Sequence, residues 1–186
     1  MDGLKLIDPI PDLAQEFLAM AAEWRDAGQD KFKDAFGDFR SYVAQLQAAT
    51  RANDLPAGWV PGNTYWLVTV TNRIVGTSRL RHWLVPHLEK EGGHIGYDVR
   101  PSERRMGYGT ALLRLTLQKA HALGLREVIV TCDSDNMGSV RIIEKNGGLL
   151  FAVATSDRTG KEIRRYRIML AGQDEREAEP AGAGDA

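Results

Sequence analysis

The sequence predicts a single mixed α/β domain, and three observations support this prediction. Apolar residues recur at helical spacing in the first third of the chain. Strand-like runs rich in β-branched and aromatic residues dominate from residue 64 onward. Short turn signals then separate alternating strands and helices. The expected order is one strand, two helices, three strands, a helix, a strand, a helix and two final strands, with no internal repeat.

The first third of the chain supplies one strand and two helices. A short strand is expected over Leu4–Ile7, where apolar residues precede two prolines. Asp12 is the expected N-cap of a helix over residues 12–26, and a second helix is expected over residues 39–51. Prolines and glycines predict a loop over residues 53–62.

Residues 64–84 predict a β-hairpin. Its strands are expected over residues 64–71 and 73–84, with a tight turn at Asn72. Gly76, inside the second strand, indicates a bulge or a close approach of another backbone. Residues 85–93 are polar and are expected to form a loop.

A strand, a loop and a helix follow. The strand is expected over His94–Val99, because Pro101 cannot donate a hydrogen bond to a ladder. The helix has an apolar stripe from Thr110 onward, and Gly124 ends it. The next strand, over residues 127–132, is almost entirely apolar, as expected for a strand buried on both faces.

The C-terminal part predicts one more helix and two strands. Asn136 is the expected N-cap of a helix over residues 137–145. Strands are expected over residues 149–155 and 163–170, around a polar turn. Residues 172–186 are acidic and rich in alanine and glycine, so this tail is expected to be disordered.

The composition limits the classes of function. The 186 residues are 43% hydrophobic and 26% charged, as in ordinary soluble domains. The chain has a net charge of −1 and the tail carries −4, which leaves +3 on the predicted domain over residues 1–171. This balance suits a polyanionic cofactor, and it argues against a nucleic-acid partner and, weakly, against a strongly cationic acceptor. The single cysteine, the lack of a signal peptide and the lack of a membrane-spanning run predict a cytoplasmic protein without a membrane partner.

The clearest functional signal is the loop before the third predicted helix. Arg104, Gly107 and Gly109 form an Arg-x-x-Gly-x-Gly pattern directly at the helix start. Free N–H groups and the helix dipole attract anions there, and glycines let a phosphate approach the backbone. Leu112 replaces the third glycine of the dinucleotide-binding pattern, and the Gly-Lys-Ser/Thr ending of P-loops is absent. The residues predict a pyrophosphate cradle; the alternative is a tight turn with exposed arginines.

This loop, preceded at Val99 by a Val-x-Pro sequence, resembles the acyl-CoA loop of the GCN5-related N-acetyltransferases (GNAT). A second segment is similar to another motif of that family: Asn136-x-x-Ser139, followed by Glu-Lys-Asn-Gly at residues 144–147. The resemblance covers residues 64–170. It implies a GNAT-like fold with a mixed, mostly antiparallel sheet of about seven strands, helices on both faces, and parallel, splayed fourth and fifth strands.

The resemblance also implies acetyl-CoA as co-substrate, with no metal. The loop would bind the pyrophosphate through backbone N–H groups, and the preceding strand would bond the pantetheine arm. The residues expected to bind acetyl-CoA are Val99, Arg104, Arg105, Met106, Gly107, Tyr108, Gly109, Thr110, Asn136 and Ser139. The implied activity is direct N-acetyl transfer to a primary amine of a small molecule or peptide. If the chain forms an oligomer, a homodimer is expected.

The sequence departs from the family at one important position. Many members carry a tyrosine seven residues after the asparagine, as general acid for the CoA thiolate, and this chain has Ile143 there. A thiolate is a fairly good leaving group, so a reaction without this acid is chemically feasible. The departure nevertheless leaves an alternative, an acyl-CoA-binding sensor or regulatory module with little catalytic activity.

The candidate catalytic residues lie in the strand before the loop. His94 is a candidate general base, Asp98 could deprotonate or orient an amine, and Tyr97 is an alternative proton donor. Each has a structural alternative as well. His94 could bond to backbone, Asp98 could pair with Arg100 or Arg104, and Tyr97 could serve only in packing.

Other candidates have stronger structural alternatives. Cys132 could act as a nucleophile, but a buried cysteine usually packs as a small hydrophobe. The spacing of His82, His87 and Glu89 matches no standard zinc pattern, so no metal is expected. An aromatic wall for the acceptor could come from Trp24, Tyr42 and Trp59.

Overall fold

The computed structural model describes residues 3–51, 55 and 58–170, and in this part of the chain it shows the seven expected strands. These are β1 (Lys5–Ile7), β2 (Gly62–Val68), β3 (Ile74–Arg81), β4 (Ile95–Val99), β5 (Glu127–Asp133), β6 (Leu149–Thr155) and β7 (Glu162–Met169). They form two hydrogen-bonded sheets, in the orders β1-β2-β3-β4 and β5-β7-β6, instead of one continuous ladder. Neighbouring strands within each sheet are antiparallel. The expected α/β fold is therefore confirmed, with the sheet divided between β4 and β5.

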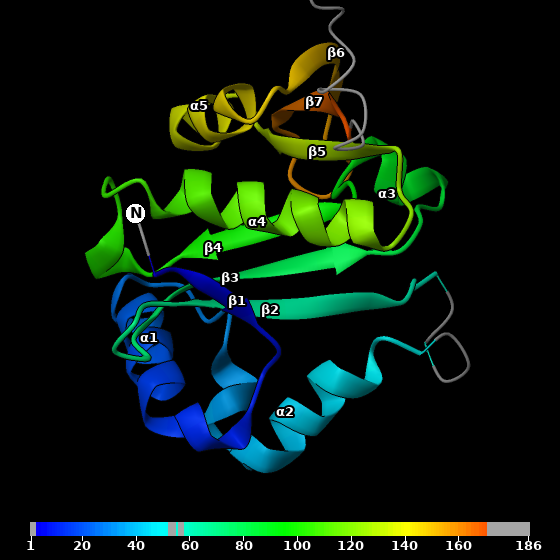
Figure 1. Ribbon diagram of the computed structural model, residues 1–186. Helices are drawn as coiled ribbons and strands as arrows, with labels where there is room; N and C mark the ends of the chain where they lie inside the picture. The colour runs from blue at the N-terminus through cyan, green and yellow to red at the C-terminus, as the bar shows by residue number, and fades with distance from the viewer. Residues whose placement is uncertain (1–2, 52–54, 56–57, 171–186) are drawn as a thin grey trace, which may run out of the picture.

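Helices cover both faces of the four-stranded sheet (Figure 1). The described helices are α1 (Ala14–Asp26), α2 (Phe39–Ala48), α3 (Pro86–Lys90), α4 (Tyr108–Ala122) and α5 (Met137–Lys145), with 3-10 turns at Pro11–Leu13, Lys33–Phe36 and Pro101–Glu103. Helix α5 lies beside the three-stranded sheet. The faces of α1 and α2 pack on one side of the sheet, where Phe17 and Trp66 are fully buried. Helix α4 packs on the other side, where Leu80 and Leu113 belong to a second core that extends to the three-stranded sheet.

Several local expectations differ from the structure. Strand β3 ends at Arg81, three residues before the expected end of its strand. Asp12 is not the N-cap of the first helix, because Pro11 begins a 3-10 turn and the α-helix starts only at Ala14. The second helix starts after Asp38, whose carboxylate accepts from two backbone N–H groups, and it ends three residues before the expected end. The expected loop over residues 85–93 contains the short helix α3, which has a proline in its first turn. The predicted tail and part of the loop over residues 53–62 lie outside the described residues.

Both structural features that Gly76 indicates, a bulge and a close approach of another backbone, are confirmed. The register between β2 and β3 shifts between Leu67 and Val68, opposite Gly76. A Cβ atom at Gly76 would lie 2.7 Å from the carbonyl oxygen of Asp98 and 3.1 Å from Leu112. The glycine therefore lets β3 and β4 approach each other under helix α4.

Strands β4 and β5 meet only at their beginnings. The N–H of His94 donates to the carbonyl of Ile129 at 2.7 Å, and the N–H of Ile129 donates to Nδ1 of His94 at 2.9 Å. No ladder joins the two strands beyond this point in the described chain. The C-terminal residues Val99 and Asp133 line the same cavity, so the strands run in the same direction and diverge. This is the expected parallel, splayed pair.

Candidate functional site

A first cavity of about 840 Å³ lies between the glycine-bearing loop, the end of β4 and the start of α5. Its lining is strongly cationic, with five basic residues against two acidic ones. The basic residues are Lys31, Arg104, Arg105, Arg141 and Lys145, and the acidic ones are Asp98 and Asp133. This excess of positive charge fits a polyanionic ligand such as the phosphates of a coenzyme.

The loop at the start of α4 has the geometry of an anion cradle. Arg105 and Gly107 both adopt positive φ angles, 64° and 84°, and Gly107 has no side chain to cap the first turn of the helix. The first N–H groups of α4 are therefore available to a ligand. A Cβ atom at Gly109 would lie 2.5 Å from Cδ1 of Ile142, so this glycine keeps α4 close to α5.

Eight of the ten residues predicted to bind acetyl-CoA line the first cavity, and two do not. Most of them line the first cavity: Val99, Arg104, Arg105, Gly107, Gly109, Thr110, Asn136 and Ser139. Met106 and Tyr108 belong to the same loop without lining the cavity within the described chain, and the Met106 side chain is exposed. Their contribution to an anion site therefore rests on their backbone N–H groups.

Trp24 of α1 forms part of the wall of the first cavity. Its indole is almost fully buried in the core that α1 forms with α2 and the sheet, and two cations lie against it. Lys31 Nζ lies 4.5 Å from the ring centroid and Arg104 Cζ lies 4.7 Å from it, both within cation–π range. Trp24 is thus both a core residue and a wall of the cavity, and it holds two of the basic residues in place.

The register of β4 determines where its backbone groups point. Arg81 N–H bonds to the His94 carbonyl and Arg100 N–H bonds to the Val75 carbonyl, so these pairs are hydrogen-bonded pairs of the antiparallel β3–β4 ladder. Because such pairs alternate along a ladder, the main-chain groups of Tyr97 and Val99 point away from β3. They face the gap where β5 diverges, and strand-like contacts with an extended ligand are possible there.

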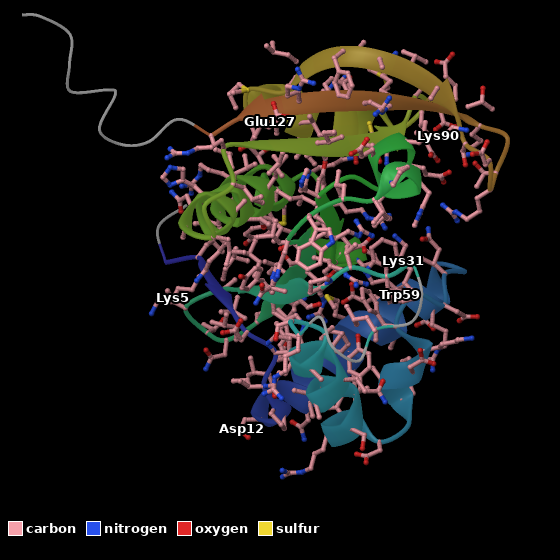
Figure 2. All side chains as sticks on the ribbon, turned by 90° about the vertical axis from the view of Figure 1, so that its right-hand side faces the viewer. Lys5, Asp12, Lys31, Trp59, Lys90 and Glu127 are labelled. Carbon is pink, nitrogen blue, oxygen red and sulfur yellow. The ribbon has the colours of Figure 1, made fainter. Side chains whose placement is uncertain are left out.

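A second cavity of about 720 Å³ lies on the α1–α2 side of the same sheet. Aromatic side chains form part of its lining: Phe17, Phe32, Tyr42 and Trp66. It shares six residues with the first cavity: Lys31, Tyr97, Asp98, Asp133 at the end of β5, and Asn136 and Ser139 at the start of α5. In the view of Figure 2, Lys31 and Trp59 lie between the three-stranded sheet and α2. The two cavities therefore meet at the splayed ends of β4 and β5.

His94 serves as a backbone partner in this structure. Its Nδ1 accepts from Ile129 at the junction of β4 and β5, and burial lowers the pKa of the imidazole. In the described part of the chain, His94 lines neither of the two cavities. The contact that His94 makes is thus the hydrogen bond to backbone that was the structural alternative to a role as general base.

Asp98 lies at the meeting point of the cavities, but its ion pair differs from the expected ones. Its carboxylate pairs with Lys31, and not with Arg100 or Arg104. Arg100 is buried and binds Glu23 at 2.6 Å on helix α1 instead. The structural alternative of an Asp98–arginine pair is therefore not what the structure shows. Arg100 lies on the same face of β4 as Asp98, but carboxylates of α1 bind it, and Lys31 reaches Asp98 instead.

Tyr97 also lies at the meeting point and keeps its proton. Its hydroxyl donates to the Ser139 carbonyl at 3.5 Å, and burial raises its pKa. Ile143 is fully buried in the core, so the position of the usual family tyrosine does not reach either cavity. Burial also raises the pKa of Cys132 to about 11, which keeps the thiol protonated at neutral pH.

Within residues 3–51, 55 and 58–170, no group of three or more histidine, cysteine, aspartate or glutamate side chains could hold a metal ion. His82 instead hydrogen-bonds to Oδ1 of Asn63 at 2.7 Å. Of the helices that the structure describes, none is long and apolar enough to cross a membrane.

The comparison with protein families decides how this geometry is interpreted. The sequence model of the Acetyltransferase (GNAT) family matches residues 17–148. The chain belongs to the GNAT family. Acetyl-CoA is the co-substrate of GNAT enzymes, and the glycine cradle and cationic first cavity of this chain fit its phosphates. A search of curated protein sequences found no significant match.

Solved GNAT structures share the fold at low sequence identity. The microcin C7 self-immunity acetyltransferase MccE, in complex with acetyl-CoA and AMP, has a TM-score of 0.67 at 16% identity, covering 91% of this chain and 94% of that chain. YncA from Salmonella typhimurium, with acetyl-CoA, has a TM-score of 0.61 at 14% identity, covering 98% and 100%. An acetyltransferase from the same organism that modifies the N-terminal serine of ribosomal protein L7/L12 has a TM-score of 0.66 at 14% identity, covering 92% and 97%.

Sequence reasoning missed several residues of this GNAT site. Lys31 lies between two predicted helices, where no periodic pattern draws attention to it. Arg79 and Arg81 line the second cavity, and alternation along the predicted strand was the one available signal for them. That alternation places them on one face with Thr77, but only the packing of α1 and α2 shows that this face lines a cavity.

Proposed function

We propose that this GNAT protein transfers an acetyl group from acetyl-CoA directly to a primary amine of a small molecule or peptide. The observation that supports this most is the meeting of two cavities at Tyr97 and Asp98. One cavity has the cationic lining and the glycine cradle that suit a coenzyme. The other opens on the far side of the sheet and offers room for an acceptor.

The coenzyme side follows from the backbone geometry. Arg104 and the first N–H groups of α4 bind the pyrophosphate, and Arg105 adds positive charge. Main-chain groups of Tyr97 and Val99 bond the pantetheine arm in the gap beside β4. Asn136 caps α5, accepting from Ser139 N–H at 3.1 Å, and so shapes the opposite wall of the gap.

The chemistry needs a neutral amine, a stabilised oxyanion and a proton for the leaving sulfur. Asp98 accepts the proton of the acceptor ammonium, directly or through water. An N–H of β4, from Tyr97 or Val99, stabilises the oxyanion formed as the amine nitrogen bonds to the carbonyl carbon. The Tyr97 hydroxyl donates its proton to sulfur as the carbon–sulfur bond breaks, in place of the family tyrosine that Ile143 replaces. His94 has a positioning role in this proposal.

The identity of the acceptor does not follow from the fold. Structures of a spermidine N-acetyltransferase chimera and of the enzyme that modifies the serine of L7/L12 share this fold at 11% and 14% identity. Their acceptors are chemically different, and a shared fold does not determine the substrate. The acceptor of this chain therefore depends on its own second cavity.

The burial of Ile143 favours a second candidate, an acyl-CoA sensor with little activity. Two measurements separate the candidates: thermal stabilisation by acetyl-CoA and by CoA, then thiol release with a broad panel of amines. Thiol release that depends on an amine supports the enzyme. Binding without turnover across the whole panel supports the sensor.

The placement of the cradle is tested by a charge reversal. Arg104→Glu should abolish the thermal stabilisation by acetyl-CoA, because it puts a carboxylate beside the pyrophosphate site. Arg114→Glu is the matched control, since Arg114 is exposed on α4 and lines neither cavity. If Arg104→Glu keeps the full stabilisation, the pyrophosphate binds elsewhere.

A further inference from the structure

Arg79 has an unusual position in the second cavity. It lies on β3 opposite Gly96 of β4, and a Cβ atom at Gly96 would meet nothing within 4 Å. The missing side chain leaves open space directly beside the Arg79 position. Asp98, the candidate amine partner, is two residues further along β4 and therefore on the same face of the sheet. Both residues line this cavity.

The other cations of the cavity already have partners. Lys31 pairs with Asp98, and Arg158 pairs with Glu91 at 3.3 Å. Arg81 donates to the carbonyls of Gly92 and Gly93 at 3.3 and 2.8 Å. Three of the four cations in the lining therefore have a partner in the protein.

Arg79 differs from these residues. No carboxylate among the described residues lies within ion-pair distance of it, and its guanidinium instead lies 5.3 Å from the ring centroid of Trp59. Burial lowers the pKa of Arg79, and burial together with the nearby Arg79 charge lowers that of Arg81. Arginine nevertheless stays charged in proteins, so its half-buried fork of N–H donors is available to an anion.

We propose that the amine acceptor carries a carboxylate, which Arg79 binds while the amine faces Asp98. This inference rests on the proposed acetyltransferase function and specifies its substrate class. A planar guanidinium binds a carboxylate with two parallel hydrogen bonds, which orients the ligand as well as holding it. The amine then lies on the Asp98 side, next to the gap where the two cavities meet.

The rest of the lining narrows the acceptor further. Phe32 and Tyr42 are half-buried and offer an apolar surface to the hydrocarbon part of an acceptor. Arg79 and Arg81 repel an acceptor with several positive charges, such as a polyamine. The chemistry that fits all of these contacts is an amino acid with an apolar side chain.

The test compares acceptors that differ only in the carboxylate. Phenylalanine, leucine and methionine are each paired with the corresponding amino-acid amide, and spermidine is added as a polycation. The wild-type protein should have a higher kcat/KM for the acids than for their amides, although the lower amine pKa of an amide favours its reaction. Equal or better activity with the amides or with spermidine would overturn the inference and leave the acetyltransferase function intact.

A substitution at Arg79 tests whether this residue causes the preference for acids over amides. Arg79→Gln should raise KM for the amino acids about 10- to 100-fold, as expected for the loss of a charge-assisted pair. KM for acetyl-CoA should stay unchanged, and the preference for the acids over their amides should fall by the same factor. Arg114→Gln is the control for loss of a positive charge, and Arg79→Lys should recover part of the affinity. If Arg79 only stacks on Trp59, Arg79→Gln lowers Tm and leaves the preference for acids unchanged, which overturns the inference.

A binding measurement keeps the inference testable without turnover. If no amine releases thiol, the proposed function fails, and calorimetry then compares N-acetylphenylalanine with its amide on the CoA-loaded protein. Binding of the acid that disappears in Arg79→Gln supports the carboxylate site. Equal binding of acid and amide, or no binding of the acid, overturns it.

Discussion

Nδ1 of His94 accepts a hydrogen bond from the backbone N–H of Ile129 at 2.9 Å, while the N–H of His94 donates to the Ile129 carbonyl at 2.7 Å. This reciprocal pair joins the two sheets at the point where β4 and β5 begin to diverge. The neighbouring residue must be small, because a Cβ atom at Gly93 would lie 2.4 Å from the Ile129 carbonyl oxygen. The gap between β4 and β5 therefore starts from this reciprocal pair of hydrogen bonds.

The first prediction concerns this contact. His94→Ala leaves the N–H of Ile129 without its acceptor in a half-buried place, so it should lower the free energy of unfolding by about 1–3 kcal/mol. Chemical denaturation measures the change. His94→Gln offers an amide oxygen in place of Nδ1 and should lose less. An equal loss in the two variants would show that the hydrogen bond does not hold the junction.

The same contact predicts a pH dependence. Burial lowers the pKa of folded His94 below its ordinary 6.5, so the unfolded chain takes up the proton first as the pH falls. The contribution of neutral His94 is present above pH 6.5 and is lost as the pH falls from there through the folded pKa. The drop in Tm between about pH 7.5 and about pH 5.5 should therefore be smaller in His94→Gln than in the wild type. The same drop in both proteins would contradict the prediction.

The glycine cradle gives a matched pair of variants. Gly107 and Gly124, at the two ends of α4, have φ angles of 84° and 85°. Alanine at either position should cost about 1 kcal/mol, because left-handed backbone is unfavourable for a residue with a Cβ atom. Calorimetry should show weaker acetyl-CoA binding only for Gly107→Ala, since Gly124 is at the far end of the helix. Equal affinities in the two variants would remove Gly107 from the binding site.

Arg100 links the cradle to helix α1. It is buried and bonds to Glu23 at 2.6 Å and to Glu16 at 3.2 Å, and Ser102 N–H also donates to Glu23. Arg100→Leu should lower the free energy of unfolding by about 1–3 kcal/mol, since the freed carboxylates are partly exposed and can rehydrate. It should also weaken acetyl-CoA binding by loosening the segment before the loop.

Glu16→Gln is the milder control for this linkage, because Glu16 is the more exposed carboxylate and its bond to Arg100 is the longer one. Glu16→Gln should change the free energy of unfolding and the affinity for acetyl-CoA less than Arg100→Leu does. Unchanged acetyl-CoA affinity in Arg100→Leu would limit the role of this cluster to stability.

Tyr97 tests the assignment of the proton donor. Burial raises its pKa, so the hydroxyl stays protonated over the neutral range and can donate. Tyr97→Phe should lower kcat about 100-fold and leave KM for acetyl-CoA unchanged, as expected for loss of a general acid. Tyr65→Phe is the control, since burial also raises the pKa of Tyr65 but it lines neither cavity in the described chain. An unchanged kcat in Tyr97→Phe would mean that the thiolate leaves without this donor.

Local sequence signals were sufficient for most of the elements and for the geometry of the glycine-bearing loop. Asn136 caps α5 as expected, and Gly124 ends α4 in the left-handed region. The Arg-x-x-Gly-x-Gly pattern places Arg104 and two glycines at the start of a helix, as expected. Caps, positive φ angles and apolar periodicity depend on residues within one or two turns of each other, so they are readable along the chain.

The candidate reacting centre depends on contacts between distant parts of the chain. Lys31 and Asp98 are 67 residues apart, and His94 and Ile129 are 35 apart. No local pattern selected Lys31 over Arg100 or Arg104 as the partner of Asp98, because that choice follows from the packing of α1 against the sheet. The sequence alone thus determined the order of the strands and of the longer helices, the family, and the glycine-bearing loop at the start of α4. The ion pairs, the junction at His94 and the meeting of the two cavities arise only when the folded chain brings these distant residues together.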